Sequence, residues 1–148
     1  MLNAIPGYSG FRRGRVGQAY NEAAFRHFLA VDRWRAARAR RSLFLVLVTV
    51  RQRPGPSAKL TDATAAALFG GLLACVREVD FVGWYREGYV AAAVLTQGSK
   101  APGDARQLIA ERIRPALRER LLPDEARNLR VRVVRLDGSV RKRLSDGV

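Results

Sequence analysis

The spacing of hydrophobic and polar residues along the chain predicts a domain that mixes helices and strands. Between Ala19 and about Arg41, apolar residues recur at helical spacing and arginines fill many of the other positions, which predicts an amphipathic helix. Residues 42–51, SLFLVLVTVR, form a continuous run of large and β-branched apolar residues, typical of a central strand buried on both faces. A second apolar pattern at helical spacing begins at Thr61 or Asp62, either of which can cap a helix, and ends near Glu78.

The second half of the chain predicts a hairpin, a helix and a last strand. Two short strands, Phe81–Tyr85 and Tyr89–Thr96, flank residues 86–88, whose glycine can supply the positive φ of a tight turn. A third helix has Pro102 near its first turn and ends before Pro123. In residues 130–136, RVRVVRL, arginines and valines are interleaved as on a half-exposed strand.

This order of elements predicts the fold class. A helix followed by β-α-β-β-α-β favours an α+β domain of the ferredoxin-like, palm type, with an antiparallel sheet and helices gathered on one face. The length of 148 residues fits one domain, which we place at residues 19–138. Glycines and arginines in residues 1–18 predict a flexible basic arm, and the polar residues 139–148 predict a flexible tail.

The net charge of +14 favours attraction to nucleic acid, anionic lipid or a phosphorylated ligand. Of the 27 basic residues, however, 24 are arginine, and alanine is also abundant. A genome rich in G and C would produce the same bias without selection for binding. The charge alone therefore identifies no partner.

The apolar segments and the single cysteine favour a cytoplasmic protein. Cys75 lies in an apolar run, has no second cysteine to pair with, and is expected to pack as a small hydrophobic residue in a reducing compartment. The longest apolar run, Leu43 to Val50, is far shorter than the roughly 20 residues of a membrane-spanning helix. The first residues also lack the apolar core of a secretory signal.

Three segments resemble the catalytic domain of GGDEF-type diguanylate cyclases. They are residues 35–48, RAARARRSLFLVLV; residues 77–90, REVDFVGWYREGYV; and residues 110–114, AERIR, of which only the last matches the family letter for letter. The resemblance extends from about Ala19 to Gly138 and implies the same palm-type fold.

The chain departs from this family where the chemistry takes place. Such enzymes condense two nucleoside triphosphates with divalent metal ions held by carboxylates on the first strand and in the hairpin. Here no Asp or Glu occurs between Ser42 and Lys59, and the hairpin reads REGY in place of GGDEF. Glu87 alone could hold a metal, although a single carboxylate beside Arg86 is more typical of a turn. We therefore expect a degenerate GGDEF-like domain without catalytic residues, metal or cofactor, acting as a regulatory or scaffolding module.

The resemblance also implies a ligand-binding pair, Arg77 and Asp80. Family members often carry Arg-x-x-Asp five residues before the signature, where it binds cyclic di-GMP, and the same spacing separates Asp80 from Arg86 here. An arginine can bind phosphate or a guanine edge bidentately, and a carboxylate accepts hydrogen bonds from guanine N–H groups. The alternative is a local salt bridge or helix-end contact, because arginine is frequent in this chain and the aspartate can serve the fold.

Three other functions remain open. The basic arm, residues 33–41 and the arginines of the last strand could bind nucleic acid, with Trp34, Trp84, Tyr85 and Tyr89 stacking on bases, although their spacing is more typical of core residues. A protein partner or a homodimer would also suit a regulatory module. Residual metal-dependent turnover of a nucleotide would require Glu87 together with Asp80.

The sequence offers no sign of other common sites. The single histidine, His27, has no neighbours at metal-ligand spacing, and no phosphate-binding glycine loop occurs.

Overall fold

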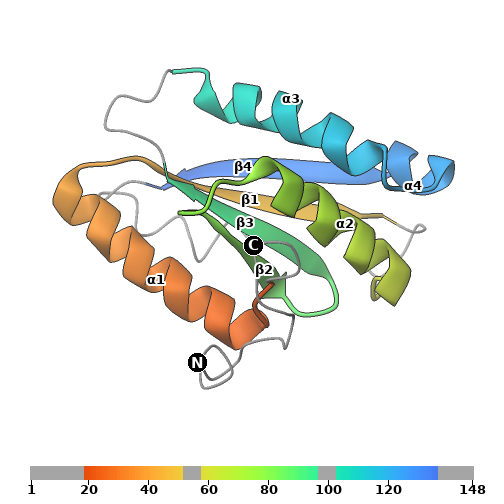
Figure 1. Ribbon diagram of the computed structural model, residues 1–148, viewed down its shortest axis with the longest axis horizontal. Helices are drawn as coiled ribbons and strands as arrows, with labels where there is room; N and C mark the ends of the chain where they lie inside the picture. The colour runs from red at the N-terminus through yellow and green to blue at the C-terminus, as the bar shows by residue number, and fades with distance from the viewer. Residues whose placement is uncertain (1–18, 52–57, 97–102, 137–148) are drawn as a thin grey trace.

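The computed structural model describes residues 19–51, 58–96 and 103–136, which form one four-stranded sheet with four helices (Figure 1). The predicted arm, the predicted tail and Pro102 lie outside these residues. The elements in chain order are α1 (Glu22–Ala39), β1 (Leu43–Val50), α2 (Asp62–Cys75), β2 (Phe81–Arg86), β3 (Val90–Thr96), α3 (Ala105–Arg118), α4 (Pro123–Arg127) and β4 (Leu129–Leu136). The predicted α+β palm-type class is confirmed.

The sheet has the order β2-β3-β1-β4, and all neighbouring strands are antiparallel. Leu43, at the start of β1, pairs with Thr96 at the end of β3 and with Leu136 at the end of β4. The start of β1 and the ends of β3 and β4 therefore meet at one end of the sheet. The hairpin between β2 and β3 lies at the opposite end.

Strand β1 is buried on both faces, as predicted. Phe44, Val46 and Val48 belong to a core with α2 and α3, whereas Leu43 and Leu45 belong to a second core with α1. The expectation that the helices gather on one face is therefore wrong for α1. The physical reason is that β1 has no polar face, so each side of the strand must be covered by apolar side chains.

The predicted start of the first helix is also wrong, because the chain is extended at Ala19 and Tyr20. Tyr20 forms a parallel bridge to Gly83: its N–H donates to the Val82 carbonyl at 3.0 Å, and its carbonyl accepts from Trp84 N–H at 2.9 Å. A Cβ atom on Gly83 would lie 2.6 Å from the Tyr20 oxygen, so only glycine permits this approach. Helix α1 begins after Asn21, whose side chain accepts from the Ala24 N–H at 3.0 Å.

The predicted hairpin is confirmed, and its turn contains Gly88 at φ +84°. The register shifts between Trp84 and Arg86, so Tyr85 is an extra residue on β2. Its side chain is buried in the α1 core.

Helix α4 is too short to show a periodic pattern, so the sequence did not reveal it. Pro123 begins the helix, and the Glu125 carboxylate accepts from the Leu122 N–H at 3.0 Å and from the Thr64 hydroxyl at 2.5 Å. One acidic side chain thus joins α4 to the first turn of α2.

The single cysteine, Cys75, packs against the core of α2 and α3, as expected for a small hydrophobic residue. Burial raises the pKa of its thiol.

Across the described helices, none combines the length and the apolar composition that a membrane crossing requires.

The two adjacent glycines of α2 provide a matched test of the packing between α2 and α3. A Cβ atom on Gly71 would lie 2.6 Å from Leu117 Cδ2 and 3.1 Å from the Ala116 carbonyl oxygen, whereas one on Gly70 would lie 3.5 Å from the flexible Arg120 side chain. We expect Gly71→Ala to lower the free energy of unfolding by about 1–3 kcal/mol through overpacking. Gly70→Ala should raise it by up to about 1 kcal/mol through helix propensity. Urea denaturation followed by circular dichroism measures both, and equal effects would contradict this packing.

Candidate ligand-binding site

The one carboxylate of the hairpin turn, Glu87, is engaged in holding α1. The Glu22 N–H donates to Glu87 Oε1 at 3.3 Å, and the Glu87 N–H donates to Glu22 Oε1 at 2.8 Å. Arg26 adds to this contact between α1 and the hairpin, because it forms an ion pair with Glu22 at 3.3 Å and donates a hydrogen bond to the Tyr85 carbonyl at 3.0 Å. Glu87 is therefore a structural link between the hairpin and the first turn of α1.

The described residues offer no metal centre at the hairpin. They contain no group of three or more His, Cys, Asp or Glu side chains that could hold an ion. Asp80 precedes β2 and Glu87 follows it, so a strand rise of about 3.3 Å per residue separates them by roughly 20 Å. A separation of that size is too long for one metal ion to bind both carboxylates.

Three side chains beside the hairpin turn, Thr49, Arg86 and Lys59, are neutral or basic. The Thr49 hydroxyl, near the end of β1, donates to the Tyr89 carbonyl at 2.9 Å. The guanidinium of Arg86 lies 4.6 Å from the centre of the Tyr89 ring, and the Lys59 side chain packs over Gly88. The first strand thus ends without the acidic side chains that would attract divalent cations.

The Asp80 side chain is buried, and its carboxylate closes the turn between α2 and β2. The side chain is only 3% exposed. Oδ2 accepts from the Arg77 N–H at 2.9 Å, and Oδ1 accepts from the Thr96 N–H at 3.1 Å. Both oxygens therefore join the turn to the end of β3. This geometry favours the local contact, which was one of the two alternatives for this residue.

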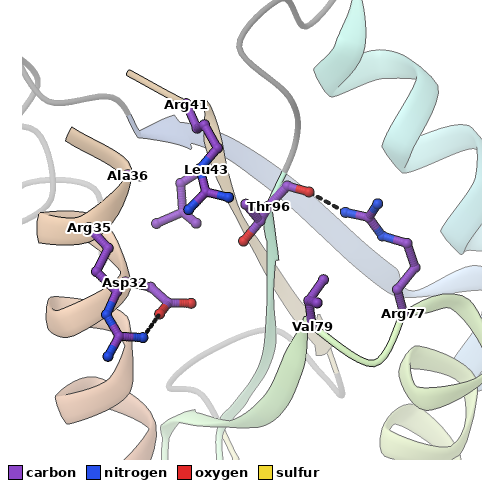
Figure 2. Close-up of a pocket in the computed structure, with 8 residues that line it drawn as sticks. All are labelled: Asp32, Arg35, Ala36, Arg41, Leu43, Arg77, Val79 and Thr96. Carbon is purple, nitrogen blue, oxygen red and sulfur yellow. Dashed lines mark hydrogen bonds and ion pairs between the residues drawn. The ribbon is translucent and has the colours of Figure 1, made fainter. Parts of the chain in front are cut away.

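Arg77 is exposed, although it takes part in the same local network. Its side chain is 62% exposed, with Nε 3.6 Å from Asp80 Oδ2. One terminal nitrogen donates to the Thr96 carbonyl, as the dashed line in Figure 2 shows. A guanidinium has five N–H donors, so Arg77 retains donors for a ligand.

Arg77 lines a cavity of about 370 Å³ at the end of the sheet opposite the hairpin. Figure 2 shows the α1 side chains on one wall, Arg77 on the other, and Val79 and Thr96 between them. The cavity thus connects the last turns of α1 with the turn that precedes β2 and with the end of β3. The lining residues are Asp32, Arg35, Ala36, Arg41, Leu43, Arg77, Val79 and Thr96.

The charged groups of the cavity are three arginines and one aspartate. Asp32 lies 4.0 Å from the Arg35 guanidinium and retains 25% exposure of its side chain. Burial raises the pKa of Asp32, the nearby Asp80 raises it further, and Arg35 and Arg41 oppose the shift. With Asp32 ionised, the lining side chains sum to two positive charges, and Asp80, which lies 3.6 Å from Arg77, offsets one of them.

Sequence reasoning found Arg77 but missed the residues that α1 contributes. Residues 33–41 were recognised only as a basic helix end, which the helix dipole already favours. Helical spacing indicates which residues share a face, but it does not say which part of the chain lies opposite them. Asp32 belongs to no recognised sequence motif.

The aromatic residues with spacing typical of the core do not all lie there. Trp84 packs edge-on against Phe69 at 4.9 Å, and Tyr85 is 3% exposed, whereas Trp34 is 61% exposed with Arg38 above its ring at 4.8 Å. Trp34 is therefore a surface residue, available for stacking. His27 is exposed on α1, with its ring 5.3 Å from that of Phe28.

Comparison of structures identifies what this fold is similar to. A diguanylate cyclase protein from Thermotoga maritima superposes with a TM-score of 0.64 at 16% identity, covering 90% of this chain and 95% of that one. The GGDEF domain of FimX from Pseudomonas aeruginosa superposes with a TM-score of 0.64 at 18% sequence identity, covering 92% of this chain and 86% of that one. The GGDEF domain of DgcB from Caulobacter crescentus, solved in complex with c-di-GMP, superposes with a TM-score of 0.54 at 12% sequence identity. The match covers 88% of this chain and 77% of that one.

These similarities are structural. At the level of sequence, no protein-family profile and no curated protein matches the chain. The chain therefore has the GGDEF-like palm fold over most of its length.

Proposed function

We propose that this protein is a non-catalytic GGDEF-like regulatory module that binds cyclic di-GMP in the cavity beside Arg77. The observation that carries the proposal is the convergence of Arg35, Arg41 and Arg77 on one cavity of about 370 Å³. That volume falls within the range of small-molecule sites, and arginine is the side chain best suited to bidentate phosphate binding. One similar structure contains c-di-GMP.

The groups at the hairpin support the non-catalytic part. Condensation of nucleoside triphosphates needs metal ions to neutralise the charge that develops on phosphate, and hard cations need several oxygen ligands. Here Glu87 accepts a hydrogen bond from the backbone of α1, and the neighbouring turn residues Gly88 and Tyr89 contact Lys59, Arg86 and Thr49. Arg86 and Lys59 add positive charge beside the turn, which disfavours a divalent cation there.

The charge balance of the Arg77 cavity supports the choice of ligand. A cyclic dinucleotide carries two phosphodiester charges. The three arginines outnumber Asp32 and Asp80, so the cavity keeps a net positive charge that attracts such an anion. In this proposal Asp80 is a positioning residue, because its carboxylate orients the Arg77 backbone and the end of β3. Arg77 makes the ligand contact.

The first of three predictions from this proposal concerns turnover. Incubation of the full chain with GTP and Mg²⁺ or Mn²⁺ should yield no cyclic di-GMP and no linear intermediate above a protein-free control, measured by anion-exchange chromatography. The reason is that residues 19–51, 58–96 and 103–136 contain no carboxylate set that could hold the metal. Metal-dependent product that disappears in Glu87→Gln would contradict the proposal.

The second prediction concerns binding. Calorimetric titration with cyclic di-GMP at moderate salt should give saturable binding, and Arg77→Ala should weaken it at least tenfold, because a charge-assisted contact is lost. Arg106→Ala is the matched control, since Arg106 is exposed on α3 and does not line the cavity.

The same protein should be titrated with single-stranded DNA over a range of salt concentrations. Affinity for DNA that falls steeply with salt, does not change in Arg77→Ala, and is accompanied by no heat with cyclic di-GMP would replace this proposal with nucleic-acid binding.

The third prediction separates the roles of Arg77 and Asp80. Asp80→Ala should lower the free energy of unfolding by about 1–3 kcal/mol, because it leaves the N–H groups of Arg77 and Thr96 without their acceptor. Asp124→Ala, at a side chain that is 84% exposed, should change stability little. Thermal denaturation compares the two, and equal stabilities would show that Asp80 does not hold the turn.

A further inference from the structure

The carboxylate that the Arg-x-x-Asp pattern assigns to the ligand is not the one that faces the cavity. The Asp80 side chain is 3% exposed, with both oxygens bonded to backbone N–H groups, whereas the Asp32 side chain lines the cavity and is 25% exposed. The acceptor most accessible to a bound molecule therefore comes from α1.

Asp32 has acceptor capacity to spare. Within the described residues, its carboxylate has an ion pair with Arg35 at 4.0 Å, which exceeds hydrogen-bond distance, and it accepts no hydrogen bond. A carboxylate offers about four lone-pair sites, and a partly buried one without donors is costly to keep ionised. The raised pKa of Asp32 reflects this incomplete solvation. A ligand that brings two N–H donors would satisfy the carboxylate.

The rest of the cavity fits a purine next to a phosphate. Val79, which is 66% exposed, presents apolar surface that can cover the face of a base, and the three arginines can bind the phosphate. The Watson–Crick edge of guanine has two adjacent N–H donors, N1–H and the N2 amino group, which match the two oxygens of a carboxylate. Adenine has an acceptor at N1, which a carboxylate repels.

We propose that Asp32 on α1 is the hydrogen-bond acceptor that makes this cavity select guanine over adenine, in the role that the sequence pattern assigns to Asp80. This inference rests on the proposed binding of a cyclic dinucleotide and adds its base specificity. When the ligand binds, Arg35 exchanges its pairing with Asp32 for the phosphate, and Asp32 pairs with the base.

The test is calorimetric titration of the full chain with cyclic di-GMP and cyclic di-AMP, repeated on Asp32→Asn. The wild-type protein should bind cyclic di-GMP at least tenfold more tightly than cyclic di-AMP. Asp32→Asn should weaken cyclic di-GMP at least tenfold and leave cyclic di-AMP equal or tighter, because one negative charge is removed beside the phosphates. Asp124→Asn makes the same charge change on α4 and should keep the wild-type preference.

The outcomes distinguish the two proposals. Binding of cyclic di-GMP that is equal in the wild-type protein and Asp32→Asn would overturn the role of Asp32 and leave the proposed function intact. If the wild-type protein binds neither cyclic dinucleotide, the proposed receptor function fails. Binding of mononucleotides then tests whether Asp32 selects guanine. Guanosine monophosphate should then shift the NMR amide signals of Ala36 and Thr96, adenosine monophosphate should not, and Asp32→Asn should abolish the shift. Identical responses to the two nucleotides, or no response, would overturn the inference.

Discussion

The arrangement of the molecule depends on the burial of β1 on both faces. A strand without polar positions must be covered twice, and here α2 and α3 cover one side while α1 lies against the other. Because β1 is also the strand that pairs with both β3 and β4, its position fixes the register of the sheet. The cavity at one end and the hairpin at the other are consequences of that register.

Most of the fold could be predicted from the sequence because its signals are local. The apolar run of β1, the turn at Gly88 and the threonine cap of α2 each act within a few residues, and each has its counterpart in the structure. The side of the sheet that α1 covers could not be predicted, because it depends on contacts between segments far apart in the chain. The extended residues before α1 depend likewise on Gly83, more than sixty positions away.

For the same reason, only part of the candidate site could be predicted from the sequence. The Arg-x-x-Asp spacing identified Arg77, but a pattern of letters does not distinguish a carboxylate that faces a cavity from one that closes a turn. Asp80 and Asp32 differ in what surrounds them: two backbone N–H groups for the first, and arginine side chains with open space for the second. Only the packing of α1 against the sheet reveals that difference.

Helix α1 touches both ends of the sheet. Its first turn is clasped to the hairpin through Glu22 and Glu87, and its later turns supply Asp32 and Arg35 to the cavity. A helix of 18 residues is a stiff rod of about 27 Å, at a rise of about 1.5 Å per residue. The contacts with the hairpin and the side chains at the cavity are therefore carried by one continuous rigid element, and the length of α1 sets the distance between them.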